Sequence, residues 1–177
     1  NKYVVKERFG SGSEKIGINL DIDLASEHAK TLSNPIFQPF IKGQEISVDA
    51  WLTKDRKVKG LVLRTRDLVI NGESQITSTF RDKAIENEIR NILESLGLSG
   101  PVVLQAILSS DNKVNVIECN ARFGGASTVS IQVGLDSLYW SILEGVGEDL
   151  SNYSFLRKGS KVRQLREPSD IYQIIDD

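Results

Sequence analysis

The chain has 177 residues and a formal net charge of −2, with 40% hydrophobic and 26% charged residues. These values are typical of a folded domain, and they exclude a disordered segment or a protein that binds nucleic acid through bulk positive charge. One cysteine, Cys119, excludes an internal disulfide and a thiolate metal site, and no apolar run approaches the roughly 20 residues of a membrane helix.

The single cysteine and the absence of a signal-peptide pattern in NKYVVKERFG predict a cytoplasmic protein with no membrane partner. The sequence contains no methionine, and its first predicted strand starts by about the third residue. We therefore hypothesise that the chain is a piece of a longer protein. A gene that starts a few residues upstream of Asn1 would refute this hypothesis.

The N-terminal region pairs a lysine with a glycine-rich loop. Residues 3–8, YVVKER, predict a strand that contains Lys6 and runs into the loop FGSGSEKIG. Glycines in such a loop let the backbone approach an anion closely, and its N–H groups can bind phosphate. The loop lacks the Walker pattern, so on its own it indicates a flexible turn. The candidate phosphate contacts are Lys6, Gly10, Ser11, Gly12, Ser13 and Gly17.

The following segment predicts a helix and then a pair of strands. Residues 24–32 fit a short helix that ends before Pro35. The run 35–41, PIFQPFI, and the alternating run 45–52, EISVDAWL, predict antiparallel strands joined by a tight turn at 42–44. Alternation places Glu45, Ser47, Asp49 and Trp51 on one face of the second strand.

The central region predicts a third strand over 57–66, KVKGLVLRTR, and a mobile connection over 66–80, RDLVINGESQITSTF. Apolar residues at helical spacing predict a helix over 83–96, with Gly97 at its C-terminal cap. Two strands around the turn SSDN follow, and 136–146 predicts an amphipathic helix with Asp136 as its N-cap.

A polar stripe marks the last predicted strand, KVNVIECNARF. Strand alternation puts Val114, Val116, Glu118, Asn120 and Arg122 on one face, and Ile117, Cys119, Ala121 and Phe123 on the core face. A turn at Asp111 and Asn112 pairs positions that sum to 223, which places Gln105 opposite Glu118. The alternative is the solvent-facing polar side of an edge hairpin with an ordinary ion pair.

The stripe offers the ligands of a hard cation. Gln105, Glu118 and Asn120 present oxygen atoms from neighbouring strand positions, and oxygen ligands favour Mg²⁺ or Mn²⁺ over zinc. Arg122 follows where a bidentate donor could hold a phosphate oxygen. A cation site beside an arginine predicts phosphoryl transfer. His28 fits a surface helix position, and Cys119 fits an inert thiol on the core face.

Together, the lysine and glycine loop, FQPFIKGQEISVD, Gln105 and VIECNARFGG resemble the ATP-grasp superfamily. The resemblance is nearest to the ATP-grasp domains of the carbamoyl phosphate synthetase large subunit and related carboxylate-amine ligases. It covers most of residues 1 to about 147, and the element E-x-N-x-R before FGG is its most specific part.

The resemblance implies an α+β ATP-grasp fold, with largely antiparallel sheets covered by helices and without the family's N-terminal α/β domain. Its parts would be a glycine-loop lobe over 1–41, a lobe with the metal and phosphate site over 42–150, and a C-terminal extension over 151–177. The missing N-terminal domain would be a partner from the same protein.

The resemblance also implies the residue roles. Lys6 and the loop from Gly10 to Gly17 would hold the ATP phosphates, and Arg122 would steady the transferring phosphate. Mg²⁺ or Mn²⁺ would be held at the end of the strand pair. The implied adenine contacts are Gln38, Phe40 and Ile41, the ribose acid is Glu45, and the metal ligands are Gln105, Glu118 and Asn120.

Ala121 replaces the proline that the family commonly places before the arginine. The leading hypothesis is an ATP- and Mg-dependent ligase that activates an unidentified carboxylate as an acyl phosphate for attack by an amine or similar nucleophile. The alternatives are a nucleotide-binding regulatory or interaction module without catalysis, and a structural domain without a ligand.

Overall fold

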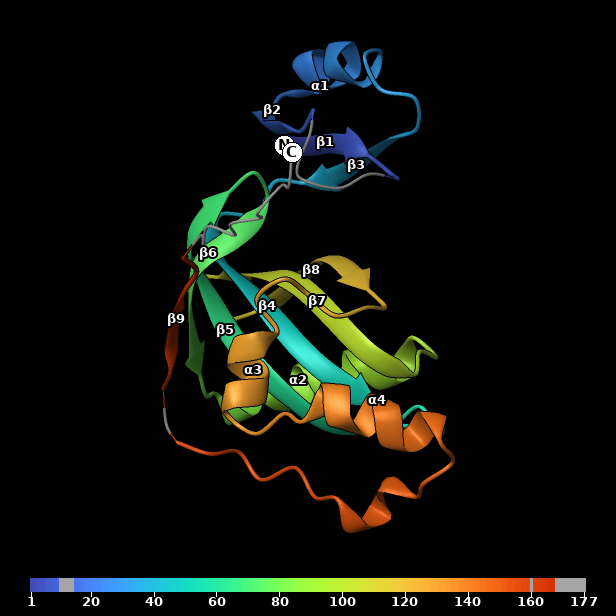
Figure 1. The fold of residues 1–177 in the computed structure, drawn as a ribbon. Helices are drawn as coiled ribbons and strands as arrows, with labels where there is room; N and C mark the ends of the chain where they lie inside the picture. The colour runs from blue at the N-terminus through green and yellow to red at the C-terminus, as the bar shows by residue number, and fades with distance from the viewer. Residues whose placement is uncertain (10–14, 160, 168–177) are drawn as a thin grey trace, which may run out of the picture.

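The computed structural model describes residues 1–9, 15–159 and 161–167. Its small sheet is antiparallel and lies at one end of the molecule, as Figure 1 shows. In spatial order its strands are β2 (Gly17–Leu20), β1 (Tyr3–Glu7) and β3 (Pro35–Pro39). Helix α1 (Ile22–Ala29) packs on one face of this sheet, where Val5 is fully buried.

The large sheet is also antiparallel throughout. In spatial order its strands are β8 (Val114–Asn120), β7 (Gly100–Ser109), β4 (Gly43–Leu52), β5 (Val58–Ile70), β6 (Glu73–Phe80) and β9 (Arg163–Leu165). The predicted α+β class, with largely antiparallel sheets covered by helices, is confirmed.

Helices cover both faces of the large sheet (Figure 1). Helix α2 (Lys83–Ser95) packs on one face, and α3 (Thr128–Gln132) and α4 (Ser137–Gly145) lie on the other, followed by the short 3₁₀ helix η1 (Leu150–Asn152). Among the described residues, no helix is long and apolar enough to cross a membrane.

Strand alternation in β4 separates two cores. Ile46, Val48, Ala50 and Leu52 point toward α2 and join the buried side chains Ile85, Ile89 and Leu93. Trp51 points to the other face, where it packs with Val62, Val133, Leu135, Trp140 and Leu150. The second core occupies one end of its face, so α3 and α4 leave the other end of that face uncovered.

Helix α2 forms where its sequence pattern predicts it. The Asp82 side chain accepts hydrogen bonds from the N–H groups of Ala84 and Ile85, which satisfies free donors of the first turn. Gly97 follows the helix with φ of +71°, a left-handed conformation that a glycine adopts without strain. The helix over 136–146 is confirmed as α4, although Asp136 makes no side-chain capping hydrogen bond.

Two predicted connections are wrong. Residues 42–44 do not join a hairpin, because β3 pairs with β1 in the small sheet whereas β4 lies in the large one. Residues 66–80 are not a mobile connection but the far half of a hairpin, in which β5 runs to Ile70 and β6 starts at Glu73. Asn71 and Gly72 both have positive φ, as the tight hairpin turn requires.

The C-terminal segment contributes to the large sheet. Strand β9 pairs with β6, where Ile76 lies opposite Leu165 and Ser78 opposite Arg163. This strand and α3 were not predicted from the sequence. The predicted boundary between residues 41 and 42 falls between β3 and β4, which belong to different sheets. The division into 1–41, 42–150 and 151–177 stays a prediction.

Candidate functional site

The uncovered end of the large sheet carries a row of polar side chains. The strand registers place Glu118 opposite Gln105, Gln105 opposite Ser47, and Ser47 opposite Arg64. Paired residues in a sheet project to the same face, so this row faces the same side as Trp51. Ser47 and Arg64 are buried, whereas the Glu118 side chain is 42% exposed at the edge of the sheet. The predicted pairing of Gln105 with Glu118 is confirmed.

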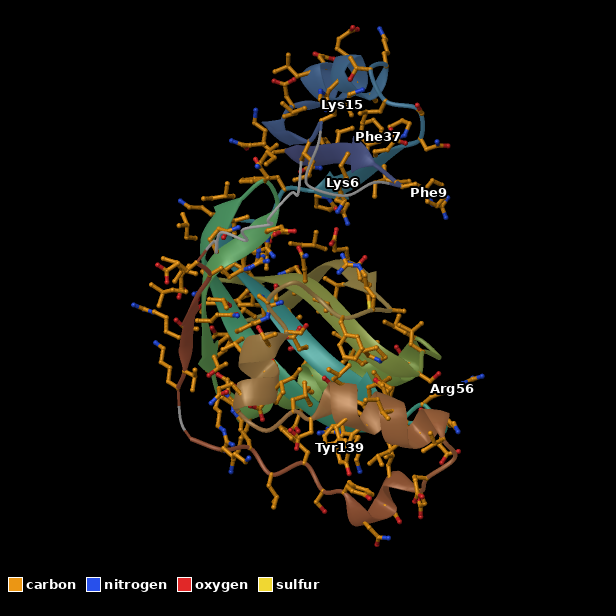
Figure 2. The ribbon with its side chains drawn as sticks, viewed as in Figure 1. Lys6, Phe9, Lys15, Phe37, Arg56 and Tyr139 are labelled. Atoms are coloured by element: carbon orange, nitrogen blue, oxygen red, sulfur yellow. The ribbon has the colours of Figure 1, made fainter. Side chains whose placement is uncertain are left out.

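The two sheets meet at Glu118. The Lys6 Nζ lies 3.7 Å from the Glu118 Oε2, and the Lys6 side chain is 12% exposed. Figure 2 shows Lys6 pointing from the small sheet toward the large one. The Asn120 Nδ2 donates to the Glu118 Oε1 at 2.9 Å, which leaves the Asn120 amide oxygen available to a ligand. Lys6, Glu118 and Asn120 therefore form one polar cluster between the sheets.

A second contact holds the sheets together beside this cluster. The Gln38 Nε2 donates to the Ile117 carbonyl at 3.1 Å. Register places Gln38 opposite Val4 and Ile36 opposite Lys6, so Gln38 and Lys6 project from the same face of the small sheet. Two predicted nucleotide-binding side chains thus reach β8 from the small sheet.

The other predicted nucleotide contacts lie at this junction or outside the described residues. The Phe40 N–H donates to the Lys2 carbonyl at 2.9 Å, so this backbone group already has a partner. The Glu45 Oε1 lies 2.8 Å from the Arg66 Nε, and this ion pair keeps the Glu45 carboxylate near the site. Gly10, Ser11, Gly12 and Ser13 lie outside the described residues.

The face assignment within β8 is partly wrong because the strand contains a bulge. Gln105 pairs with Glu118 but Ala106 pairs with Val116, so Ile117 is the extra residue. The bulge reverses the alternation toward the start of the strand, and Val114 packs against the α2 core instead of sharing the face of Glu118. Cys119 packs against that core as predicted.

Arg122 does not continue the strand. β8 ends at Asn120, and the Arg122 N–H donates to the Asn120 carbonyl at 2.9 Å in a bend. Because the extended backbone ends here, Ala121 and Phe123 are exposed rather than part of the core. The Arg122 Nη1 donates to the Phe123 carbonyl at 3.0 Å. Arg122 still borders the cavity that Gln105 and Asn120 line.

The donor set fits a hard divalent cation. Among the described residues, no three His, Cys, Asp or Glu side chains gather as a metal site would require. A cation would thus rely on the Glu118 carboxylate with the amide oxygens of Asn120 and Gln105. Mg²⁺ is commonly held by one or two carboxylates together with substrate phosphates, and this set matches that pattern.

A buried ion pair separates the covered and uncovered ends of the sheet face. The Arg64 Nε donates to the Asp49 Oδ2 at 2.8 Å, and both side chains are at least 95% buried. The hydroxyls of Ser127 and Ser130 donate to the same carboxylate at 2.7 and 2.5 Å. The Gly124 N–H donates to the Ser127 Oγ, so this cluster fixes the glycine segment after Arg122.

A cavity of about 100 Å³ lies next to Asn120 and Gln105. Its lining contains four arginines from three separate parts of the chain, together with Glu73 and two glycines. The arginines are Arg64, Arg66, Arg122 and Arg166, and the glycines are Gly124 and Gly125. Sequence reasoning found Arg122 alone, although the alternation of Arg64 and Arg66 in LVLRTR signalled that both share one strand face.

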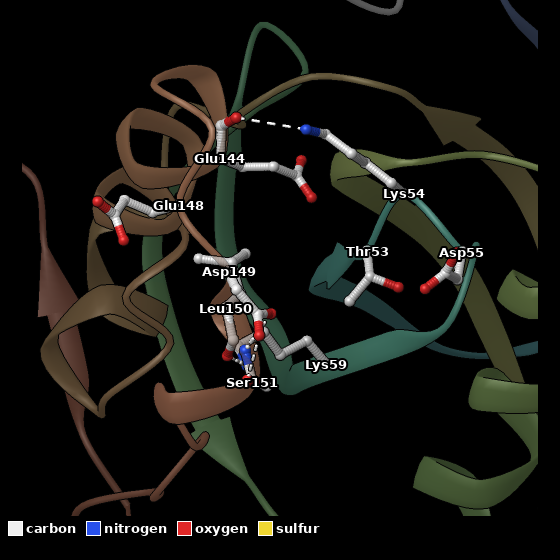
Figure 3. A pocket seen from close by; sticks show the side chains of 9 residues that line it. All are labelled: Thr53, Lys54, Asp55, Lys59, Glu144, Glu148, Asp149, Leu150 and Ser151. Carbon is white, nitrogen blue, oxygen red and sulfur yellow. Dashed lines mark hydrogen bonds between the residues drawn. The ribbon is translucent and has the colours of Figure 1, made fainter.

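A second cavity, of about 380 Å³, lies at the opposite end of β4 (Figure 3). Lys59 donates to the Leu150 carbonyl at 2.6 Å, and its Nζ lies 5.3 Å from the centre of the Trp140 ring. Burial lowers the pKa of the Lys59 ammonium, and the Asp149 carboxylate opposes that shift. These contacts join β5 to the segment after α4, so we assign this cavity a structural role.

His28 and Cys119, the remaining candidate residues, have structural surroundings that do not suggest a catalytic role. The His28 Nε2 lies 3.0 Å from the Lys15 carbonyl, and the ring belongs to the face of α1 near the small sheet. Partial burial raises the pKa of the Cys119 thiol, which disfavours the reactive thiolate. The Cys119 side chain packs toward the α2 core, on the opposite face from Glu118, and His28 lies on α1.

The family model described as "ATP-grasp in the biosynthetic pathway with Ter operon" matches residues 31–168. The chain belongs to this ATP-grasp family. The match includes Gln38, Glu45, Gln105 and the segment from Glu118 to Arg122, and it confirms the resemblance to the superfamily. The finer resemblance to carbamoyl phosphate synthetase stays a prediction. No curated protein matches the chain.

Solved structures show the same fold. The biotin carboxylase domain of 2-oxoglutarate carboxylase from Hydrogenobacter thermophilus, in complex with MgADP and bicarbonate, aligns with a TM-score of 0.74 at 16% identity, over 92% of this chain and 40% of that one. N5-carboxyaminoimidazole synthetase from Staphylococcus aureus, complexed with ADP, gives 0.64 at 18% identity, over 84% and 42%. L-amino acid ligase from Bacillus licheniformis gives 0.55 at 21% identity, over 75% and 34%. The chain thus spans about two fifths or less of the length of these ATP-grasp proteins.

Proposed function

We propose that the chain is the nucleotide- and metal-binding part of an ATP-dependent ligase that activates a carboxylate as an acyl phosphate. The observation that carries the proposal is the cluster of Lys6, Glu118 and Asn120 between the two sheets, in a chain of the ATP-grasp family. Solved proteins of the same fold were captured with ADP or MgADP. The proposed cofactors are therefore ATP and Mg²⁺, with Mn²⁺ as a substitute.

The proposed nucleotide site lies between the small sheet and the uncovered end of the large one. Lys6 would bind phosphate oxygens from the small sheet, together with the loop from Gly10 to Ser13. Gln38 and the backbone of Phe40 and Ile41 would face adenine. Glu45, which Arg66 holds at 2.8 Å, would accept hydrogen bonds from the ribose hydroxyls. In this arrangement the terminal phosphate would point toward Glu118.

Gln105, Glu118 and Asn120 would hold Mg²⁺ through oxygen atoms, and the bound cation supplies charge neutralisation at the phosphates. Lys6 and Arg122 would stabilise the charge that spreads over the transferring phosphoryl group. Arg122 suits this role because it lies in the bend after Asn120, next to the cavity. Positioning and charge stabilisation are sufficient for phosphoryl transfer, so the site needs no nucleophilic side chain.

The reaction would proceed in two steps. A carboxylate oxygen of the acceptor attacks the γ-phosphorus, the bond from phosphorus to the β–γ bridging oxygen breaks, and ADP leaves with that electron pair. An amine or similar nucleophile then attacks the acyl carbon, inorganic phosphate leaves, and the proton of the nucleophile passes to solvent. The products are ADP, phosphate and an amide or related acyl compound.

The partners and the location of this activity are also proposals. The chain spans 40% of the first solved relative, so other protein segments would complete the acceptor site. The acceptor carboxylate and its nucleophile are therefore properties of the whole protein. The predicted cytoplasmic location fits a reaction that consumes ATP.

The test uses hydroxylamine as a general nucleophile, because it traps acyl phosphates as hydroxamates. ADP and hydroxamate would be measured with a panel of carboxylates, on this chain and on any longer polypeptide that contains it. Glu118→Gln should lower turnover by about 100- to 1000-fold, the range for removal of one charge-stabilising group. Glu88→Gln, at an exposed position of α2, is the matched control. Full turnover in Glu118→Gln would refute the assignment.

A further inference from the structure

The cavity beside Asn120 contains more guanidinium groups than the transfer of one phosphoryl group uses. The proposed reaction assigns Arg122 to the transferring phosphate. Arg64, Arg66 and Arg166 also line the cavity and have no part in that step. They come from β5 and from the segment after β9, so the fold brings distant parts of the chain together at this point.

Carboxylates hold these three arginines in place: Asp49 and Glu45, which are not part of the lining, and Glu73, which is. Arg64 is bound by the buried Asp49, and the side chain of Arg66, which is 7% exposed, lies 2.8 Å from Glu45. The Arg66 Nη2 also donates to the Gly72 carbonyl at 3.0 Å. Each contact uses some of the five donors of a guanidinium and leaves others. The side chains are thus ordered before any ligand binds, which lowers the entropy cost of binding.

Arg166 closes the cavity from the C-terminal segment. Its Nη1 donates to the Glu73 Oε2 at 2.8 Å, and its backbone N–H donates to the Gln75 carbonyl at 2.9 Å. A Cβ atom at Gly125 would lie 3.3 Å from the Arg166 Nη1, so a larger residue there would press against the guanidinium. Glycine at position 125 keeps the space beside Arg166 open.

We propose that this cavity binds a second anionic group of the acceptor, a carboxylate or a phosphate, separate from the carboxylate that becomes phosphorylated. A volume of about 100 Å³ admits such a group but not a whole acceptor. Guanidinium groups bind carboxylates and phosphates through paired N–H donors, which matches a lining that contains several arginines. The inference rests on the proposed function, because it concerns the acceptor of the same site.

The test compares acetate with malonate, succinate and glutarate by calorimetric titration in the presence of MgADP. Phosphonoacetate is included to distinguish a phosphate-like second group from a carboxylate. We expect at least one doubly anionic probe to bind about tenfold more tightly than acetate, in line with one added charge-assisted hydrogen bond. Arg166→Gln should remove that advantage. Arg163→Gln, three residues earlier at the start of β9 and outside the cavity lining, should keep it.

Two results would overturn the inference: acetate that binds as tightly as every doubly anionic probe, or the same affinities in Arg166→Gln and Arg163→Gln. A parallel titration with MgATP tests the proposed function separately. If the wild-type chain prefers doubly anionic probes but does not bind MgATP, the proposed function alone is refuted. MgATP binding without that preference would refute the second anion site alone.

Discussion

The same face of the large sheet is built differently at its two ends. At one end Trp51, Val62 and Trp140 form an apolar core beneath α3 and α4. At the other end Gln105, Glu118 and Asn120 face the small sheet, and Lys6 reaches across to them. Because strands continue through both ends, the covered end can hold the geometry of the uncovered end rigid. The comparison shows where this face stabilises the fold and where it can bind a ligand.

Asp49 lies at the boundary between the two ends, and its substitution should reduce the free energy of unfolding more than the other changes considered below. Asp49→Ala leaves the buried Arg64 guanidinium and the hydroxyls of Ser127 and Ser130 without their acceptor. Loss of one partner of a buried pair costs about 3–5 kcal/mol of unfolding free energy. Urea denaturation measures this loss. Asp55→Ala, at an exposed turn, is the control, and an equal effect of the two variants would contradict the assigned role of Asp49.

Truncation in the covered end should reduce stability without a direct effect on nucleotide contacts. Leu135 is 1% exposed in the core with Trp51 and Trp140. Leu135→Ala removes buried methyl groups and leaves a cavity, which costs about 2–5 kcal/mol. Denaturation of the variant should show this loss while MgATP affinity, measured well below the transition, stays near the wild-type value. A large fall in MgATP affinity with unchanged stability would contradict the assignment of Leu135 to a core that only stabilises the fold.

Truncation of Lys6, at the uncovered end, should weaken MgATP binding but change stability little. The ion pair between Lys6 and Glu118 is 3.7 Å long, and the Glu118 side chain is 42% exposed. Lys6→Ala should therefore change stability by about 0–1 kcal/mol. Loss of the ammonium from the phosphate site should weaken MgATP binding by about tenfold or more, since 1.4 kcal/mol corresponds to a factor of ten. Lys54→Ala, in the second cavity, should leave MgATP affinity unchanged.

The smallest effect concerns Cys119, which lies next to Glu118 in sequence but packs toward the α2 core. Because burial raises the pKa of this thiol, its thiolate fraction at neutral pH is below that of a free cysteine. The native protein should react with a disulfide reagent more slowly than the urea-unfolded protein, and saturating MgATP should not change the rate. Equal rates in the native and unfolded states would show that the side chain is accessible.

Local patterns predicted part of the geometry around the candidate site. A turn at Asp111 and Asn112 predicted pairs that sum to 223, and the pair of Gln105 with Glu118 has that sum. Nearer the turn the pairs sum to 222, as for Leu108 with Val114, and the bulge at Ile117 makes up the difference. The bulge at Ile117 did not follow, because no residue type in VNVIECN marks it. As a result Val114 was assigned to the wrong face. The hairpin over 66–80 was missed because its outer part is polar and reads as a loop.

Contacts between distant segments were beyond such patterns. Asp49 and Arg64 meet across neighbouring strands, and Ser127 and Ser130 join them only when α3 packs on the sheet. Arg166 reaches the cavity because β9 pairs with β6 from the far end of the chain. Alternation assigns Asp49 and Arg64 to strand faces, but no local pattern shows which distant residues meet there, so these contacts emerge from the tertiary structure alone.

The most direct test of a magnesium-dependent ATP site between the two sheets is a thermal-shift titration with ATP and Mg²⁺. ATP with a chelator and GTP with Mg²⁺ serve as controls, and Glu118→Gln is measured beside the wild type. At 100 times the dissociation constant a ligand adds about 2.7 kcal/mol to the stability of the folded state. We expect a rise in Tm that requires Mg²⁺, favours ATP over GTP and is reduced in Glu118→Gln. An equal rise with the chelator, or an unchanged rise in Glu118→Gln, would contradict the proposed site.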